Sequence, residues 1–170
     1  MSSMMKKIFF PLFIFILIAS INICLADPVE LPGFTKSAYF DEQITTFNYG
    51  SDIRIHINAP SAANFDAAKP VGLALFALPN GNTIEQTVGK ILKAGDDWHY
   101  DIQHIGAQTR FLRQQISDYN LITVYLEASQ KSWPAWKAAH TDHATIIKNL
   151  AEYLKSCFGY HPVEVIPCCF

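Results

Sequence analysis

The chain has 170 residues, of which 50% are hydrophobic, 13% aromatic and 16% charged, and its formal net charge is -2. This length suits one domain of about 100–200 residues, and the apolar fraction excludes a chain that is disordered by composition. The weak charge argues against a nucleic-acid-binding protein. Without an internal repeat of about 20–50 residues, the chain is not a solenoid or a propeller.

Residues 1–26 have the pattern of a secretion signal peptide. Lys6 and Lys7 precede an apolar run over residues 8–21, and small residues stand where a signal peptidase would cleave, between Ala26 and Asp27. The run is shorter than the ~20 residues of a membrane-spanning helix. We therefore expect cleavage, no stable membrane span afterwards, and a secreted or periplasmic protein; an uncleaved anchor is the alternative.

Cleavage would leave a mildly acidic mature chain. It removes two lysines and leaves 144 residues with 11 basic and 15 acidic side chains, so the net charge becomes -4. A chain of this charge has no basic face for nucleic acid or for anionic lipid headgroups. The expected partner is instead an unidentified small molecule.

The mature chain is predicted to begin with an irregular lead-in over residues 27–44, followed by two antiparallel strands. Thr45–Tyr49 and Ile53–Ile57 flank a Gly-Ser-Asp turn, and the second segment alternates isoleucine with polar residues, which is the period of a half-buried strand. Residues 60–70 form a loop of small residues. Val71–Leu78 is apolar on both faces, as expected for a strand buried between layers of helices.

Helices and strands then alternate. Thr83 and Gln86 form a capping-box pattern that opens a helix through Ala94, and an apolar stripe from Trp98 to Ile116 predicts a second helix. The remaining predicted elements are a strand, a short helix, a longer helix and a last strand: Leu121–Leu126, Ser132–His140, His143–Phe158 and Val163–Ile166. This order predicts a three-layer α/β fold over residues 45–170, with a mostly parallel sheet and an antiparallel first pair of strands.

The order of elements resembles the N-terminal half of the α/β-hydrolase fold, and three stretches of sequence look similar to it as well. They are Leu75–Thr83 after the third strand, Trp98–His104, and Glu127–Trp136 after the fourth strand. One of them, Trp98–His104, resembles a stretch in some secreted bacterial hydrolase-like proteins. The resemblance to serine esterases and lipases implies a partial α/β-hydrolase-like fold, an ester-type substrate and no cofactor. It also implies an oxyanion loop after the third strand.

The sequence departs from this family where the nucleophile is expected. Such hydrolases carry a Gly-x-Ser-x-Gly turn after the fifth strand, and the acid and histidine follow later in the chain. Here the predicted fifth strand is followed by residues 167–170, and no Gly-x-Ser-x-Gly occurs. We therefore expect a truncated, catalytically inactive relative of a secreted serine hydrolase, with no catalytic residue assigned. The alternatives are a small exported ligand-binding module and a half-domain completed by a second polypeptide.

Asn80, Gly81 and Asn82 are the candidate oxyanion-loop residues. Backbone N–H groups of a glycine-containing turn before a helix can converge on a developing negative charge. The alternative interpretation is an ordinary strand-to-helix turn, which a Pro-Asn-Gly sequence explains by itself.

Trp133 and Trp136 are the candidate pocket residues. They follow a buried strand, and open α/β sheets bind ligands at the carboxyl ends of their strands. They are predicted either to wall an apolar pocket or to pack over the sheet.

Cysteines and histidines complete the set of candidate residues. Cys157 could form a disulfide with Cys168 or Cys169 in an oxidising compartment. A zinc site needs three or four converging ligands, and the histidine pair His140 and His143 does not supply them. No metal site is therefore predicted.

Overall fold

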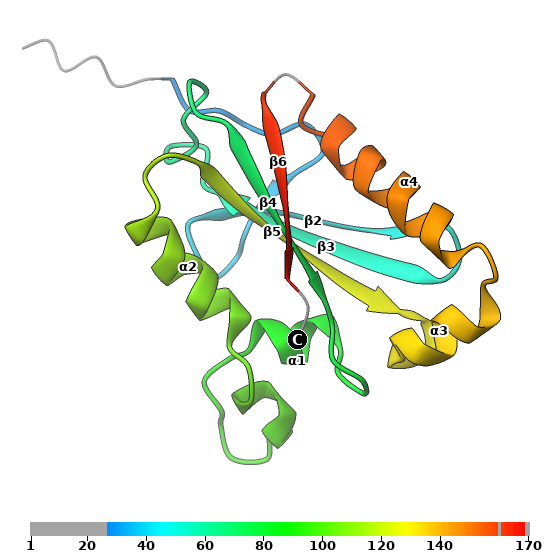
Figure 1. Cartoon of the computed structure of the whole chain (residues 1–170). Helices are drawn as coiled ribbons and strands as arrows, with labels where there is room; N and C mark the ends of the chain where they lie inside the picture. Colours follow the sequence, from blue (N-terminus) through cyan, green and yellow to red (C-terminus); the bar gives the residue numbers. More distant parts are fainter. Residues whose placement is uncertain (1–26, 160, 169–170) are drawn as a thin grey trace, which may run out of the picture.

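The computed structural model describes residues 27–159 and 161–168 (Figure 1). The predicted signal peptide, including Ala26 of its cleavage site, lies outside the described residues, and so do residues 160, 169 and 170.

The described residues contain one six-stranded sheet with strand order β1-β2-β3-β5-β4-β6. The strands are β1 (Thr35–Lys36), β2 (Glu42–Tyr49), β3 (Ile53–Pro60), β4 (Val71–Ala77), β5 (Asn120–Ala128) and β6 (Val163–Cys168). β4 pairs in parallel with both β5 and β6, whereas β1/β2, β2/β3 and β3/β5 are antiparallel pairs. The α/β class is confirmed, but the sheet is mixed rather than mostly parallel. The reason is that β5 inserts between β3 and β4, so that β3 gains a second antiparallel neighbour.

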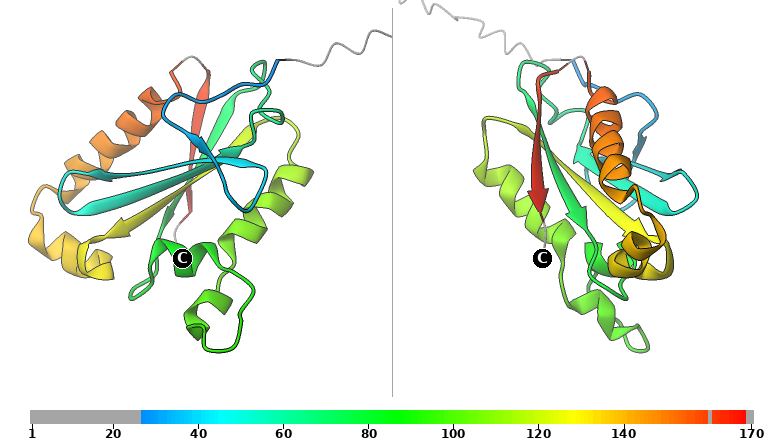
Figure 2. Two further views of the ribbon diagram at one scale, coloured as in Figure 1. Left: turned by 180° about the vertical axis from the view of Figure 1, so that it is seen from behind. Right: turned by 45° about the vertical axis from the view of Figure 1, so that its right-hand side comes forward.

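Helices cover both faces of the sheet, which gives three layers (Figure 2). α1 (Ile84–Val88) and α2 (Ile105–Gln115) lie on one face, and α3 (Trp133–Ala139) and α4 (His143–Ser156) lie on the other. No helix in the described part of the chain is long and apolar enough to cross a bilayer.

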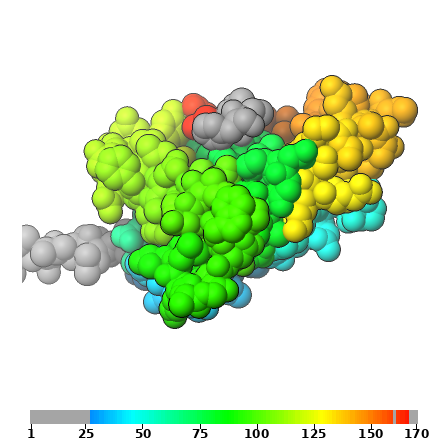
Figure 3. Space-filling view, turned by 90° about the horizontal axis from the view of Figure 1, so that it is seen from below, coloured from blue at the N-terminus to red at the C-terminus, as the bar shows by residue number. Residues whose placement is uncertain are grey.

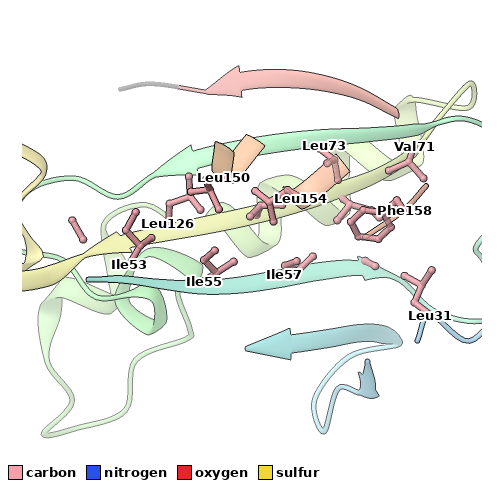
Figure 4. Close-up of a cluster of buried hydrophobic side chains, with 14 of the residues drawn as sticks. Leu31, Ile53, Ile55, Ile57, Val71, Leu73, Leu126, Leu150, Leu154 and Phe158 are labelled. Carbon is pink, nitrogen blue, oxygen red and sulfur yellow. The ribbon is translucent and has the colours of Figure 1, made fainter. Parts of the chain in front are cut away.

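The larger hydrophobic core lies between the sheet and the helices α3 and α4 (Figure 4). Ile53, Ile55 and Ile57 of β3 are buried on this face, as their alternation predicts. Leu150 and Leu154 of α4 pack against the same cluster because residues four apart share one face of a helix. A smaller core, which includes Ile84 and Ile105, lies beneath α1 and α2.

The first two helices are shorter than the sequence predicts. α1 ends at Val88 because Gly89 adopts φ of +82°, and a Cβ at this glycine would lie 2.8 Å from Cα of His104. Residues 89–104 therefore form an irregular segment that contains the 3-10 helix η1 (Trp98–Asp101), and α2 begins only at Ile105. The apolar stripe predicted from Trp98 to Ile116 is consequently broken, and only its middle part is buried.

The strand β2 begins at Glu42, inside the predicted irregular lead-in, and β1 also lies there. Glu42 and Gln43 are buried despite being polar. Gln43 donates from Nε2 to the carbonyls of Val29 and Pro60, and its Oε1 accepts from the N–H of Leu31. A buried polar side chain is tolerated where such partners satisfy it, so the strand extends further than its apolar pattern indicates.

Candidate functional site

The candidate oxyanion loop lies at the carboxyl edge of the parallel strands. β4 and β5 are paired in register and end close together, at Ala77 and Ala128. The loop after β4 therefore meets the loop after β5, and the N–H of Gly81 donates to the carbonyl of Lys131 at 2.9 Å. The loop thus lies at the edge where open α/β sheets bind ligands, and its role as an oxyanion loop stays a prediction.

Two of the three candidate residues already use their N–H groups within the chain. Gly81 donates to Lys131, and Asn82 donates to the carbonyl of Pro79 at 3.2 Å. Gly81 itself has φ of +88°, a conformation that favours glycine. An oxyanion hole needs donors that are free to point at the developing charge. In this conformation Gly81 and Asn82 instead close a strand-to-helix turn.

The start of α1 is capped by side chains. Thr83 and Gln86 form the predicted capping box: the N–H of Thr83 donates to Oε1 of Gln86 at 2.9 Å, and the N–H of Gln86 donates to Oγ1 of Thr83 at 3.2 Å. The N–H of Ile84 donates to Oε2 of Glu127 at 2.7 Å. These bonds satisfy donors that the first turn of a helix otherwise leaves unpaired.

Glu127 belongs to a charged cluster that sequence reasoning missed. Arg54 of β3 lies opposite Glu127 of β5 and forms ion pairs with Glu127, at 3.6 Å, and with Glu85 of α1. Burial raises the pKa of Glu85, but hydrogen bonds from its own backbone and from Arg54 outweigh burial and lower it overall. The cluster ties α1 to the sheet, and it leaves these carboxylates paired with a cation rather than available as bases.

His56 lies two residues beyond Arg54 on the same face of β3. Its Nδ1 is 2.8 Å from Oγ1 of Thr46, and its ring lies 5.8 Å from that of Tyr125. Burial is the main cause that lowers the pKa of His56 and that raises the pKa of Tyr125 to about 12. Both rings are therefore neutral near pH 7.

The lowered pKa of His56 predicts a loss of stability on acidification. The folded state favours the neutral ring, and this contribution to the free energy of unfolding is fully present above pH 6.5, the ordinary pKa of histidine in the unfolded chain. It is lost as the pH falls from there through the lower pKa of His56 in the folded state. We expect the free energy of unfolding to fall more for the native chain than for a His56→Gln variant between about pH 8 and about pH 5.5. Urea unfolding at the two pH values measures this difference. An equal fall in both proteins would contradict the assignment, and His99→Gln is the control.

Trp133 and Trp136 pack over the sheet. Ser132 caps α3 by accepting from the N–H of Ala135 at 3.3 Å, and this helix carries Trp136 into the larger core. The two indole rings contact edge to face at 5.3 Å, and Trp133 packs against the same core. Neither of the two cavities described below is lined by these tryptophans.

His140 closes the end of α3. Its ring stacks on Trp136 at 4.6 Å, its Nδ1 lies 2.7 Å from the Trp136 carbonyl, and its Nε2 lies 3.0 Å from Oδ2 of Asp52. The hydrogen bond to the Trp136 carbonyl is the main cause that raises the pKa of His140, and Asp52 adds to it. Because both ring nitrogens are engaged, His140 is suited to holding α3 rather than to accepting a proton from a substrate.

The side chain of Cys168 lies outside the described part of the chain, so the disulfide between Cys157 and Cys168 stays a prediction. Cys157 follows the end of α4 and is a free, exposed cysteine. Cys168 is the last residue of β6, which begins at Val163 beside that helix end.

An ion cluster around the buried carboxylate of Glu42 lies at the opposite edge of the sheet, and sequence reasoning missed it. The carboxylate of Glu42 accepts from Arg113 at 3.0 Å, from Asn58 at 2.9 Å, and from Arg110 at 3.3 and 3.4 Å. Arg113 also donates to the carbonyls of Asn58 and Leu121. Burial lowers the pKa of Arg113 to about 10, although Glu42 opposes this effect.

Arg110 borders a cavity of about 580 Å³ at this edge. The cavity lies between the end of β3, the start of β5 and the end of α2, and a smaller cavity of about 300 Å³ lies on the other side of Glu42. The guanidinium of Arg110 lies 3.6 Å above the ring of Phe40. Ser61 also lines the cavity, and its buried hydroxyl has no hydrogen-bond partner among the described residues.

Among the described residues, no three His, Cys, Asp or Glu side chains converge as a metal site would require. Comparisons with protein-family models, with curated proteins and with solved structures gave no significant match.

Proposed function

We propose that this chain is an exported α/β-hydrolase-like protein and that it is a catalytically inactive relative of secreted serine hydrolases. An antiparallel opening pair, followed by parallel strands with helices on both faces, supports the hydrolase-like interpretation. The signal-peptide pattern of residues 1–26 supports export to a secreted or periplasmic location.

One observation carries the proposal of inactivity: Gly81 and Asn82 donate their N–H groups to carbonyls of the chain itself. Donors that are already bonded cannot stabilise an oxyanion unless the two loops separate. The absence of a Gly-x-Ser-x-Gly motif in the 170 residues agrees with this interpretation.

Purified protein should hydrolyse short-chain nitrophenyl esters no faster than buffer alone. The same assay on Asn80→Ala and on Asn48→Ala, an exposed control on β2, distinguishes loop chemistry from general surface effects. Turnover above background that Asn80→Ala abolishes and Asn48→Ala preserves would contradict the proposal.

A second candidate function is favoured by the cavity beside Arg110. We infer that this cavity binds a small organic anion, so the expected ligand-binding module would use Arg110 rather than the predicted tryptophans. Glu42 is held closely by Arg113 and Asn58, whereas its contacts with Arg110 are longer. One carboxylate and two guanidinium groups leave a net positive charge, and Phe40 holds the Arg110 guanidinium in a fixed orientation.

Titration with benzoate tests this inference, and benzamide is the neutral control of the same shape. We expect benzoate to bind the native chain more tightly than benzamide, and Arg110→Gln to weaken benzoate about 10-fold or more, as for the loss of a charge-assisted hydrogen bond. Lys137→Gln on α3, outside the residues lining the cavity, should have no effect. Equal binding of both ligands, or benzoate binding unchanged by Arg110→Gln, would contradict the inference.

A further inference from the structure

Three large apolar side chains are exposed on one projecting segment, residues 89–104 between α1 and α2. The exposed fractions are 90% for Ile91, 66% for Trp98 and 49% for Ile102. The segment extends beyond the carboxyl edge of the sheet (Figure 1), and it lies at the front of the molecule when that edge faces the viewer (Figure 3). Single exposed hydrophobic residues are ordinary, but three on one short projecting segment favour an interaction site.

Several polar side chains of this segment bond to other groups of the segment or to α1. Lys90 Nζ donates to Asp96 at 2.8 Å, and the backbone N–H of Lys93 donates to the same carboxylate at 2.9 Å. Asp97 accepts from Nε2 of Gln86 in α1 at 2.7 Å and from the N–H of His99 at 3.0 Å. The segment is thus held in shape by its hydrogen bonds, without the three apolar side chains having to pack inward.

Charge is nearly balanced in the segment. Its two lysines and three aspartates give a net charge of -1. Asp96 is paired with Lys90, and Asp101 lies 2.8 Å from Nε2 of His104. A surface of this kind offers little attraction to an anionic lipid, so any association with a membrane must come from apolar burial.

We propose that the segment is a membrane-docking tip, which places Ile91, Trp98 and Ile102 in the boundary between headgroups and acyl chains of a zwitterionic bilayer. Tryptophan favours this boundary because its ring is apolar while its N–H can reach water. A protein partner is a poorer fit because a stable protein interface takes about 20–30 residues on each side, and this protrusion is one short segment. The proposal requires no membrane-spanning helix and is independent of hydrolase activity.

Sedimentation with phosphatidylcholine vesicles tests the proposal on the chain from Asp27 to Phe170, because the apolar residues 8–21 would bind lipid themselves. We expect the native chain to sediment with vesicles. The Trp98→Ser variant should have a partition coefficient about 10-fold or more lower, because it loses the free energy gained by burying a large apolar side chain in the bilayer. Phe111→Ser is the matched control, because Phe111 is also highly exposed but lies on α2 outside the segment. It should change the partition coefficient less than about twofold.

The salt dependence of binding and the oligomeric state of the chain distinguish a zwitterionic bilayer from two other binding partners, an anionic lipid surface and a second copy of the chain. Raising NaCl from about 0.05 M to about 0.5 M should leave binding nearly unchanged, and thermal unfolding of Trp98→Ser should match that of the native chain because Trp98 is exposed. The proposal fails if the native chain does not sediment with phosphatidylcholine, or if Phe111→Ser weakens binding equally. It also fails if binding requires anionic lipid, or if the lipid-free chain forms a dimer that Trp98→Ser dissociates.

Discussion

Replacing Glu42 with glutamine should lower the free energy of unfolding by about 3–5 kcal/mol, the cost of removing one partner from a buried ion pair. Glu42 is buried, and its carboxylate balances Arg113, whose side chain is only 14% exposed. Without that carboxylate, Arg113 would keep its charge in a site where burial already disfavours it. Urea unfolding monitored by circular dichroism measures the change.

The neighbouring residue Asp41 provides the matched control. Its carboxylate lies 3.9 Å from Lys36, and both side chains are exposed. Exposed ion pairs contribute about 0–1 kcal/mol, so Asp41→Asn should have a small effect. If Glu42→Gln costs no more than Asp41→Asn, the cluster does not stabilise the fold and the two arginines are adequately solvated.

Trp136→Ala should destabilise the chain by about 3–5 kcal/mol, the usual cost of truncating a large aromatic side chain in a core. Trp136 is buried among residues of the larger core and stacks on His140. Its removal leaves a cavity beneath α3 and frees the His140 ring that holds the end of that helix. Chemical unfolding of the variant measures the loss.

Trp98→Ala is the control for this prediction, because Trp98 is an exposed tryptophan and its removal leaves no cavity. The free energy of unfolding of that variant should stay within about 0.5 kcal/mol of the native value. A Trp136→Ala protein that is as stable as the native chain but loses affinity for a small apolar ligand would restore the pocket interpretation.

The strands were predictable because their residues alternate or are apolar on both faces. Ile53, Ile55 and Ile57 point into the larger core, as a period of two requires. The capping box of Thr83 and Gln86 was also predictable, because both of its hydrogen bonds form between residues three apart.

The cluster around Glu42 could not be predicted from local patterns. Its partners Arg110 and Arg113 lie 68 and 71 residues further along the chain. The residues around Glu42 do not alternate between apolar and polar side chains, so the sequence predicts an irregular lead-in where β2 begins. The position of Arg110 and Arg113 off the apolar stripe of α2 indicates solvent exposure, and only the tertiary structure shows that they reach Glu42.

The position of the loop after β4 could be predicted from the sequence, but the hydrogen bonding of its N–H groups could not. Proline, asparagine and glycine indicate a turn there, and the order of elements places it at the carboxyl edge. Whether the N–H of Gly81 is free depends on Lys131, fifty residues away in the loop after β5. Gln130 and Lys131 adopt φ of +58° and +52°, an uncommon conformation for these residues that nothing in their sequence indicates.

Hydrogen exchange at the Gly81 amide tests most directly whether this loop is a closed turn. Amides that are hydrogen bonded in a folded protein exchange only when the structure opens. We expect the Gly81 N–H to exchange about 10-fold or more slowly than in an unstructured peptide of the same sequence. Exchange of Gly81 at the unstructured rate, in a chain whose β4 and β5 amides remain protected, would show that its N–H is free and would contradict the closed-turn assignment.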